Sequence, residues 1–151
     1  MYERPPRDFI HVPNEIYKDY NEACEILPTS PHAAAVLTRR CLQHLLRALG
    51  FTQRNLANQI KALDQRLGSR NSLSCSTREL ADTVRLIGNL AAHPTFVASS
   101  RKAITLEYED ADWCLEIIEE LLDYFYERPA MFEARLMRLE GRLQSAGASL
   151  F

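Results

Sequence analysis

The sequence predicts an all-α fold, a bundle of about six helices in a single domain. Apolar residues recur at spacings of three and four along nearly the whole chain, as they do on one face of a helix. Glycine occurs only five times in 151 residues, and prolines or glycines stand where one periodic segment gives way to the next. Strand-like alternation is confined to residues 104–108, which form a short and isolated stretch.

Two helices are predicted in the first third of the chain, after an extended arm at residues 1–12. The first begins at residue 13 or 14 and runs to residue 27, because Pro28 cannot continue a helix. The second spans residues 31–49. Its predicted N-cap is Ser30, since a serine hydroxyl can accept a hydrogen bond from a free backbone N–H of the first turn.

The middle of the chain predicts two further helices with a polar loop between them. The third helix covers residues 55–67 and ends at Gly68, a residue that readily adopts the left-handed conformation of a C-terminal stop. The fourth helix runs from residue 76 to about 93. Ser76 and Glu79 at its start have the spacing of a capping box, in which each side chain accepts a hydrogen bond from the backbone N–H of the other residue.

The last two helices are predicted at residues 109–127 and 130–145, separated by Pro129. The predicted inner face of the fifth helix carries Trp113, Ile117, Leu121 and Phe125. The apolar stripe of the sixth helix consists of Phe132, Leu136, Leu139 and Leu143. This stripe could pack on the bundle or on a second copy of the chain.

These elements divide the chain into three parts. They are an N-terminal arm at 1–12, a helical bundle at 13–128, and a C-terminal amphipathic helix with its tail at 129–151. The net charge is only −2, so overall charge does not indicate a nucleic-acid or membrane binder. The segment 1–11 lacks the apolar run of a signal peptide, and no apolar stretch approaches membrane-spanning length. We expect a cytoplasmic protein without a membrane partner.

Metal and cofactor chemistry is not indicated. The four cysteines are far apart in sequence, which argues against a zinc site and against a disulfide framework. A glycine-rich phosphate loop, a nucleophile elbow and a histidine–glutamate zinc motif are all absent. The acids of the fifth helix have no histidine beside them. We therefore expect no metal and no cofactor.

A polar stripe on the fourth helix is the strongest candidate for chemistry. Arg85, Asn89 and His93 follow one another at intervals of four on an otherwise mostly apolar helix, so they should be neighbours in space. A histidine can exchange a proton near neutral pH, an arginine can hold a phosphate, and an asparagine can orient either group. The competing interpretation is a solvated face, on which Asp82 and Arg85 form a surface pair.

The second helix carries a cationic face formed by Arg39, Arg40 and Arg47. Three arginines on one face could bind the phosphates of a nucleic acid. Alternatively the face is merely exposed, or one arginine pairs with an acid of a neighbouring helix. Arg39 is nearest to the apolar border of the helix and is the best candidate for a buried structural partner.

Several stretches resemble a known family. Residues 85–93 (RLIGNLAAH) are similar to the signature of the domain of unknown function 4145 family. Residues 13–23 (PNEIYKDYNEA) resemble its opening, and residues 34–46 (AAVLTRRCLQHLL) resemble its second block, with Arg39 at the family arginine. The resemblance covers about residues 12–129.

The resemblance implies a HEPN-like helical bundle, because that family is related to the HEPN superfamily. Many members of the superfamily are homodimers, and several are metal-independent RNases whose catalytic helix places an arginine and a polar residue before a histidine. Asn89 and His93 match the last two positions, Gly88 stands where the arginine would be, and Arg85 lies one turn earlier.

Two functions follow from this resemblance. One is a non-catalytic dimerisation and interaction module in a nucleic-acid or phage-defence context, with a homodimer partner and RNA or a nucleic-acid-processing protein as a further partner. The alternative is a toxin-like, metal-independent RNase. Its composite dimer site would use His93 as general acid/base, Arg85 on the phosphate and Asn89 to orient the histidine or the substrate.

Overall fold

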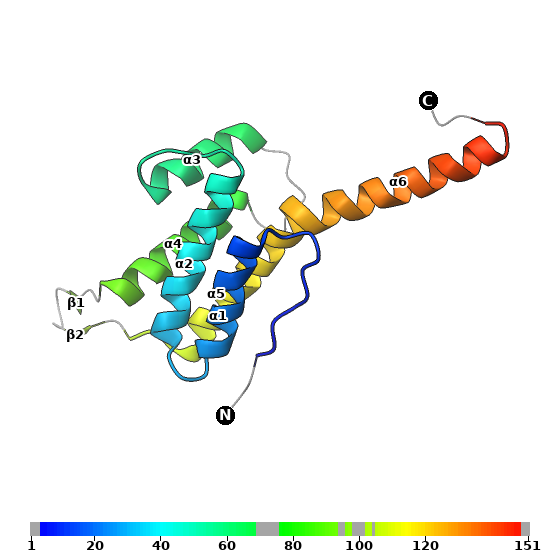
Figure 1. Cartoon of the computed structure of the whole chain (residues 1–151). Helices are drawn as coiled ribbons and strands as arrows, with labels where there is room; N and C mark the ends of the chain where they lie inside the picture. Colours follow the sequence, from blue (N-terminus) through cyan, green and yellow to red (C-terminus); the bar gives the residue numbers. More distant parts are fainter. Residues whose placement is uncertain (1–3, 69–75, 94–95, 98–101, 104, 149–151) are drawn as a thin grey trace.

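The structure, a computed structural model, describes residues 4–68, 76–93, 96–97, 102–103 and 105–148 (Figure 1). The predicted all-α class is confirmed, and the strands among these described residues form one antiparallel pair of two residues each between the fourth and fifth helices. The helices are α1 (Asn14–Ile26), α2 (Pro31–Ala48), α3 (Leu56–Leu67), α4 (Thr77–Ala92), α5 (Tyr108–Leu122), the π-helical segment η1 (Asp123–Glu127) and α6 (Arg128–Ser145). The strands are β1 (Phe96–Val97) and β2 (Lys102–Ala103).

The helix ends are set by the capping residues that the sequence indicates. Ser30 Oγ accepts a hydrogen bond from the backbone N–H of Ala33 at 3.1 Å, and Ser76 Oγ accepts one from the N–H of Glu79 at the same distance. Each hydroxyl thereby satisfies a donor that the helix itself cannot pair. Gly68 ends α3 with a φ of +66°, which a residue with a side chain rarely adopts.

Helix α2 lies at the centre of the bundle, where it packs against α1, α4 and α5 (Figure 1). The core consists of apolar side chains from these four helices and α3, joined by Phe9 and Val12 of the arm and by Phe51 and Leu106 of the connecting segments. Its largest fully buried side chains are Tyr20, Ile16, Leu27, Leu42, Leu45, Leu46, Ile60, Leu63, Leu115, Ile117, Ile118 and Leu121. This arrangement places the polar residues of α2 between two neighbouring helices.

The predicted break at Pro129 is wrong, because the chain remains helical from Tyr108 to Ser145. Proline cannot donate a backbone hydrogen bond, and its ring collides with the carbonyl four residues earlier in an α-helix. The π-helical segment η1 widens the turn just before Pro129, and the N–H of Arg128 reaches back five residues to the carbonyl of Asp123. The wider turn relieves the collision, so the proline does not end the helix.

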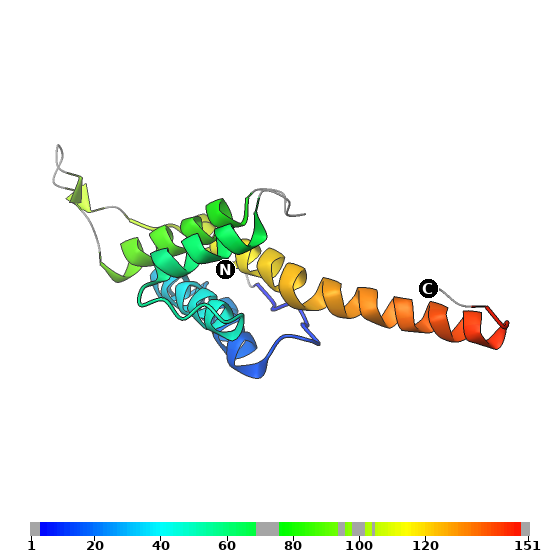
Figure 2. The same cartoon turned by 90° about the horizontal axis from the view of Figure 1, so that it is seen from above.

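Helix α6 projects away from the bundle (Figures 1 and 2). Among the elements that the structure describes, it contacts only η1. Phe132 is 68% exposed and Leu139 42% exposed, and no residue of α6 is buried. Of the two predicted arrangements of this apolar stripe, the structure does not show the one in which it packs on the bundle.

Two smaller expectations have different outcomes. Trp113 is 50% exposed rather than buried, whereas Ile117 and Leu121 of the same predicted face lie in the core. The buried side of α5 is centred on the row that contains Cys114 and Ile118, which leaves the large indole at its margin. Residue 104, the first of the alternating stretch 104–108, lies outside the described residues. The polar loop predicted at 69–75 lies outside them as well.

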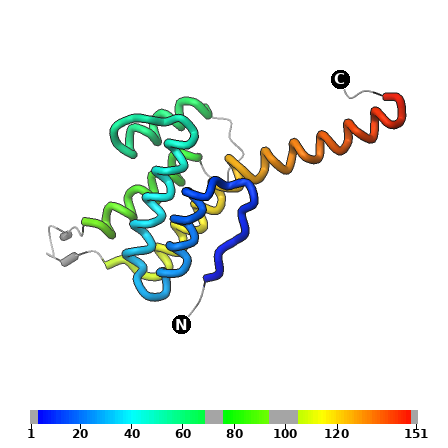
Figure 3. Tube along the Cα trace, in the orientation of Figure 1, coloured from blue at the N-terminus to red at the C-terminus, as the bar shows by residue number. Residues whose placement is uncertain are grey.

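The N-terminal arm runs alongside the bundle in the direction opposite to α1 (Figure 3). It is fixed by hydrogen bonds to two elements: Arg7 N–H donates to the Tyr20 hydroxyl of α1 at 2.8 Å, and His11 N–H donates to Glu127 Oε1 of η1 at 2.8 Å. Within the described part of the chain, every helix is too short or too polar to cross a membrane.

Candidate functional site

The polar stripe of α4 is divided among different partners. Arg85 Nε donates to Asp82 Oδ1 at 3.1 Å on the same helix, the pair expected for a solvated face. Asn89 instead points its side-chain oxygen at α2 and accepts from Arg39 Nε at 2.8 Å. Two of the three residues proposed for catalysis, Arg85 and Asn89, therefore interact with Asp82 and Arg39.

His93 lies at the C-cap of α4 rather than within the helix. Its backbone φ of −133° and ψ of 83° are not helical, and its N–H donates to the carbonyl of Asn89 at 2.8 Å. The residue is exposed. His93 is therefore the last residue whose N–H bonds into α4, and its own backbone has already left the helical conformation.

Arg39 lies across Gly88 where α2 meets α4. A Cβ atom placed on Gly88 would be 2.6 Å from Cβ and 2.9 Å from Cδ of Arg39, closer than carbon atoms pack. The missing side chain of Gly88 thus allows Arg39 to cross the helix and reach Asn89. Arg39, proposed above as a buried structural partner or a nucleic-acid contact, is half-buried and hydrogen-bonded to an amide rather than to an acid.

Arg40 and His44 of α2 converge on a buried carboxylate of α1, that of Asp19. Arg40 donates two hydrogen bonds to Asp19 Oδ1, one from Nε at 3.0 Å and one from a terminal nitrogen at 2.7 Å. His44 Nδ1 lies 2.7 Å from Asp19 Oδ2, and among the described residues neither atom has a further hydrogen-bond partner. The contact satisfies both atoms when the imidazole proton is on Nδ1.

Asp19 and His44 were not among the residues proposed from sequence. A signal for Asp19 was present, because it lies on the same helix face as Ile16 and Ala23, where a charge is stable only if it is paired. The cluster is open to the surface, since Glu15, Lys18, Asp19, Arg40 and His44 line a cavity of about 460 Å³. Arg47 is exposed and lines an adjacent cavity of about 410 Å³ with His44.

Replacing Asp19 with alanine is expected to lower the free energy of unfolding by about 1.5 kcal/mol, the lower end for a lost hydrogen bond to a charged group. The effect is small for a buried ion pair because half of the Arg40 side chain is exposed and can be hydrated once its partner is gone. Chemical denaturation measures the difference. Lys18→Ala, at an exposed position of the same helix, is the control and should change stability by less than about 0.5 kcal/mol.

A second buried polar cluster joins the arm to α5 and α1. Both terminal nitrogens of Arg4 donate to the Glu119 carboxylate at 2.8 Å, its Nε contacts Asp112, and the Tyr20 hydroxyl donates to Glu119 at 2.5 Å. Burial favours the neutral acid, but the hydrogen bonds from Arg4 and Tyr20 outweigh it, so the pKa of Glu119 is lowered. Burial and the same carboxylate raise the pKa of Tyr20.

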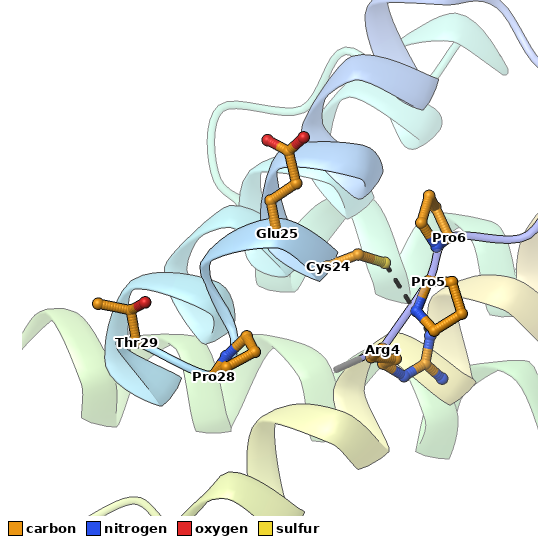
Figure 4. A pocket seen from close by; sticks show the side chains of 7 residues that line it. All are labelled: Arg4, Pro5, Pro6, Cys24, Glu25, Pro28 and Thr29. Atoms are coloured by element: carbon orange, nitrogen blue, oxygen red, sulfur yellow. Dashed lines mark hydrogen bonds between the residues drawn. The ribbon is translucent and has the colours of Figure 1, made fainter. Parts of the chain in front are cut away.

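Arg4 also lines a cavity of about 520 Å³ between the arm and the end of α1 (Figure 4). One terminal nitrogen of Arg4 lies 4.0 Å from the sulfur of Cys24. Burial raises the pKa of the Cys24 thiol, so it is not an activated nucleophile. Cys24, Cys41 and Cys114 are all buried free thiols, whereas Cys75 lies outside the described residues.

Among the residues that the structure describes, no three acidic, histidine or cysteine side chains are grouped so that they could hold a metal ion. In the two clusters described above, a buried carboxylate is bound by arginine together with histidine or tyrosine. They can hold helices together or bind an anion through arginine.

Comparison with known families gives one match. The family model described as "Domain of unknown function (DUF4145)" matches residues 21–142, which is most of the chain. Comparisons with curated proteins and with solved structures gave no match.

Proposed function

The chain belongs to the DUF4145 family, and from this premise we propose that it is a non-catalytic dimerisation and interaction module acting in a nucleic-acid or phage-defence context. The context comes from the resemblance to HEPN proteins. The proposed partners are a second copy of the chain and either RNA or a nucleic-acid-processing protein.

The observation that supports a non-catalytic role is the contact of Arg39 with Gly88 and Asn89. In the resemblance to HEPN nucleases, Gly88 stands where a catalytic arginine would be. Here the Arg39 side chain fills the space over Gly88, so there is no room for an arginine side chain at position 88. Asn89 is used as the acceptor for Arg39 at 2.8 Å. Asn89 thereby joins α4 to α2.

The alternative, a metal-independent RNase, is supported by one feature of the same contact. Arg39 brings a guanidinium group next to Asn89 from α2, so an arginine lies beside the asparagine although Gly88 carries none. In this alternative Arg39 would hold the phosphate in place of Arg85, and His93 would transfer the proton. Two such sites would meet in the dimer.

An RNA cleavage assay in the presence of a metal chelator separates the two functions. The chelator removes cleavage by contaminating metal-dependent nucleases, while a metal-independent enzyme stays active. The proposal expects no cleavage of single-stranded or structured RNA above the level of a His93→Ala preparation. Cleavage by the wild-type protein that His93→Ala abolishes would overturn the proposal and support the RNase.

The structural role of Asn89 has its own expected result. Asn89→Ala removes the acceptor of the half-buried Arg39 guanidinium and should lower the free energy of unfolding by about 1.5–3 kcal/mol. Thermal or urea unfolding measures this change. Asn58→Ala, at an exposed position of α3, is the matched control and should stay within about 0.5 kcal/mol of wild type. A silent Asn89→Ala variant would contradict the role of this residue in joining the helices.

A further inference from the structure

Helix α6 presents an apolar stripe that no described element covers. Phe132 and Leu139 are exposed, Leu136 and Leu143 are part-exposed, and the only described element that α6 contacts is η1. The helix continues directly from α5 through η1, so its first turns are already formed. An isolated helix of this length is marginal in water because nucleation is unfavourable, and continuity with the bundle removes that barrier.

The stripe has the spacing of a coiled-coil seam. Phe132, Leu136, Leu139 and Leu143 are separated by four, three and four residues, which are the intervals between the d and a positions of a heptad. A seam of this kind is complementary to another helix with the same spacing. A second α6 offers an identical row of side chains.

The charges beside the seam distinguish between the two orientations of such a pair. Glu133 and Glu140 occupy the e positions, and Arg128, Arg135 and Arg142 occupy the g positions. In a parallel pair a g residue faces the e residue five positions later on the other helix. Arg128 then faces Glu133 of the partner subunit, and Arg135 faces Glu140 of the partner subunit.

An antiparallel pair would place the same charges unfavourably. Its flanking contacts join g to g and e to e, so arginines would face arginines and glutamates would face glutamates. Like charges at these positions disfavour an arrangement, and this is how coiled coils select their orientation. The charge pattern therefore favours a second copy of this chain in parallel register.

We infer that α6 of one chain pairs with α6 of a second copy as a short parallel coiled coil, with the seam at 132, 136, 139 and 143. The inference rests on the homodimer of the proposed function and identifies its interface. The two-fold axis runs along the coil, so both bundles lie at the same end of the helix pair and face each other across the axis.

The first test measures the dimer dissociation constant of the full chain by sedimentation velocity. Leu136→Asp/Leu139→Asp places charge in the seam and should raise the dissociation constant by at least about 100-fold, since burial of two leucines per chain is lost. Met137→Asp adds the same charge on the same helix, but at a 66% exposed position outside the seam, and should leave the constant within about threefold. Both positions lie outside the core, and circular dichroism checks that the bundle stays folded.

Charge reversal tests the flanking pairs. Glu140→Arg alone and Arg135→Glu alone should each weaken the dimer at low salt, because each places like charges opposite one another in the parallel pair. The double variant restores opposite charges and should return to near the wild-type constant. Additive weakening in the double variant would overturn the pairing of these two residues.

Oxidative cross-linking tests the orientation. Leu143→Cys should form a disulfide between the two copies, because a parallel pair brings position 143 of each chain together near the end of the coil. The unsubstituted chain under the same conditions accounts for its own cysteines. Absence of the cross-link in a dimeric variant overturns the parallel arrangement.

The outcomes separate this inference from the proposed function. If the wild-type chain is dimeric and the Leu136→Asp/Leu139→Asp variant remains dimeric, the interface lies elsewhere, which overturns the coiled coil and leaves the homodimer intact. A wild-type chain that is monomeric at every concentration overturns both.

Discussion

Glu119→Ala is expected to lower the free energy of unfolding by about 3–5 kcal/mol, the range for breaking a buried ion pair by removing one partner. Glu119 is 8% exposed and is the shared acceptor for Arg4 and Tyr20, and Tyr20 is fully buried. Without the carboxylate, the guanidinium and the hydroxyl lose their acceptor where water has little access. Urea unfolding measures the loss, and the arm should become susceptible to proteolysis at lower temperature.

The matched control is Glu116→Ala, at an exposed position of the same helix, which should change stability by less than about 0.5 kcal/mol. An equally small effect at Glu119 would contradict the assignment of the Arg4 cluster as a structural tie. Such a result would mean that the arm is held by its other contacts alone.

The same carboxylate predicts the pH dependence. The pKa of Glu119 is lower in the folded protein than in the unfolded chain, where it is about 4.3. Its ionised form therefore contributes stability that is fully present above that value and is lost as the pH falls through the folded pKa. The stability difference between wild type and Glu119→Gln should be largest near neutral pH and should shrink as the solution is acidified.

Gly88→Ala is expected to destabilise the protein by about 2 kcal/mol, in the range for overpacking of a close-packed site. The added Cβ would lie 2.6 Å from Cβ of Arg39, an atom bonded directly to the α2 backbone. Rotation of the Arg39 side chain cannot relieve that contact, so α2 and α4 must move apart. This cost outweighs the gain of about 1 kcal/mol that alanine normally brings to a helix interior.

Gly141→Ala is the matched control, because the same substitution in α6 meets no atom within 4 Å. It should raise helicity or leave stability unchanged. A loss of stability for Gly88→Ala without a loss for Gly141→Ala, measured by thermal unfolding, would establish that the effect at Gly88 comes from the close approach of Arg39. A neutral or stabilising Gly88→Ala variant would contradict the tight crossing of α2 and α4.

The helices were predictable because their signals are local. Ser30, Ser76 and Gly68 act within one turn of the chain, and the spacing of apolar residues selects the buried face of each helix. The exception is Pro129, whose usual effect is to break a helix. A π-helical turn, which depends on how the residues before it pack, accommodates the proline instead.

The candidate site was predictable only in part. The sequence placed Arg85 and Asn89 on one face of α4, but the partner of each depended on which helix lies opposite. Asn89 faces Arg39 because α2 crosses α4 at Gly88, and His93 is the C-cap residue of α4 with a non-helical backbone. Asp19 of α1 and His44 of α2 are in contact, and the spacing of residues within one helix does not predict a contact between two helices.

The sequence by itself determined that this chain is helical, where most of the helices begin and end, and that it belongs to the DUF4145 family. Only the tertiary structure decided that Arg39 and Asn89 join two helices, that Arg4 is anchored on Glu119, and that α6 leaves the bundle with its apolar stripe exposed. The physical reason is the range of the interactions. Capping and apolar periodicity act between residues a few positions apart, whereas hydrogen bonds between helices and the burial of a helix face depend on how distant segments pack.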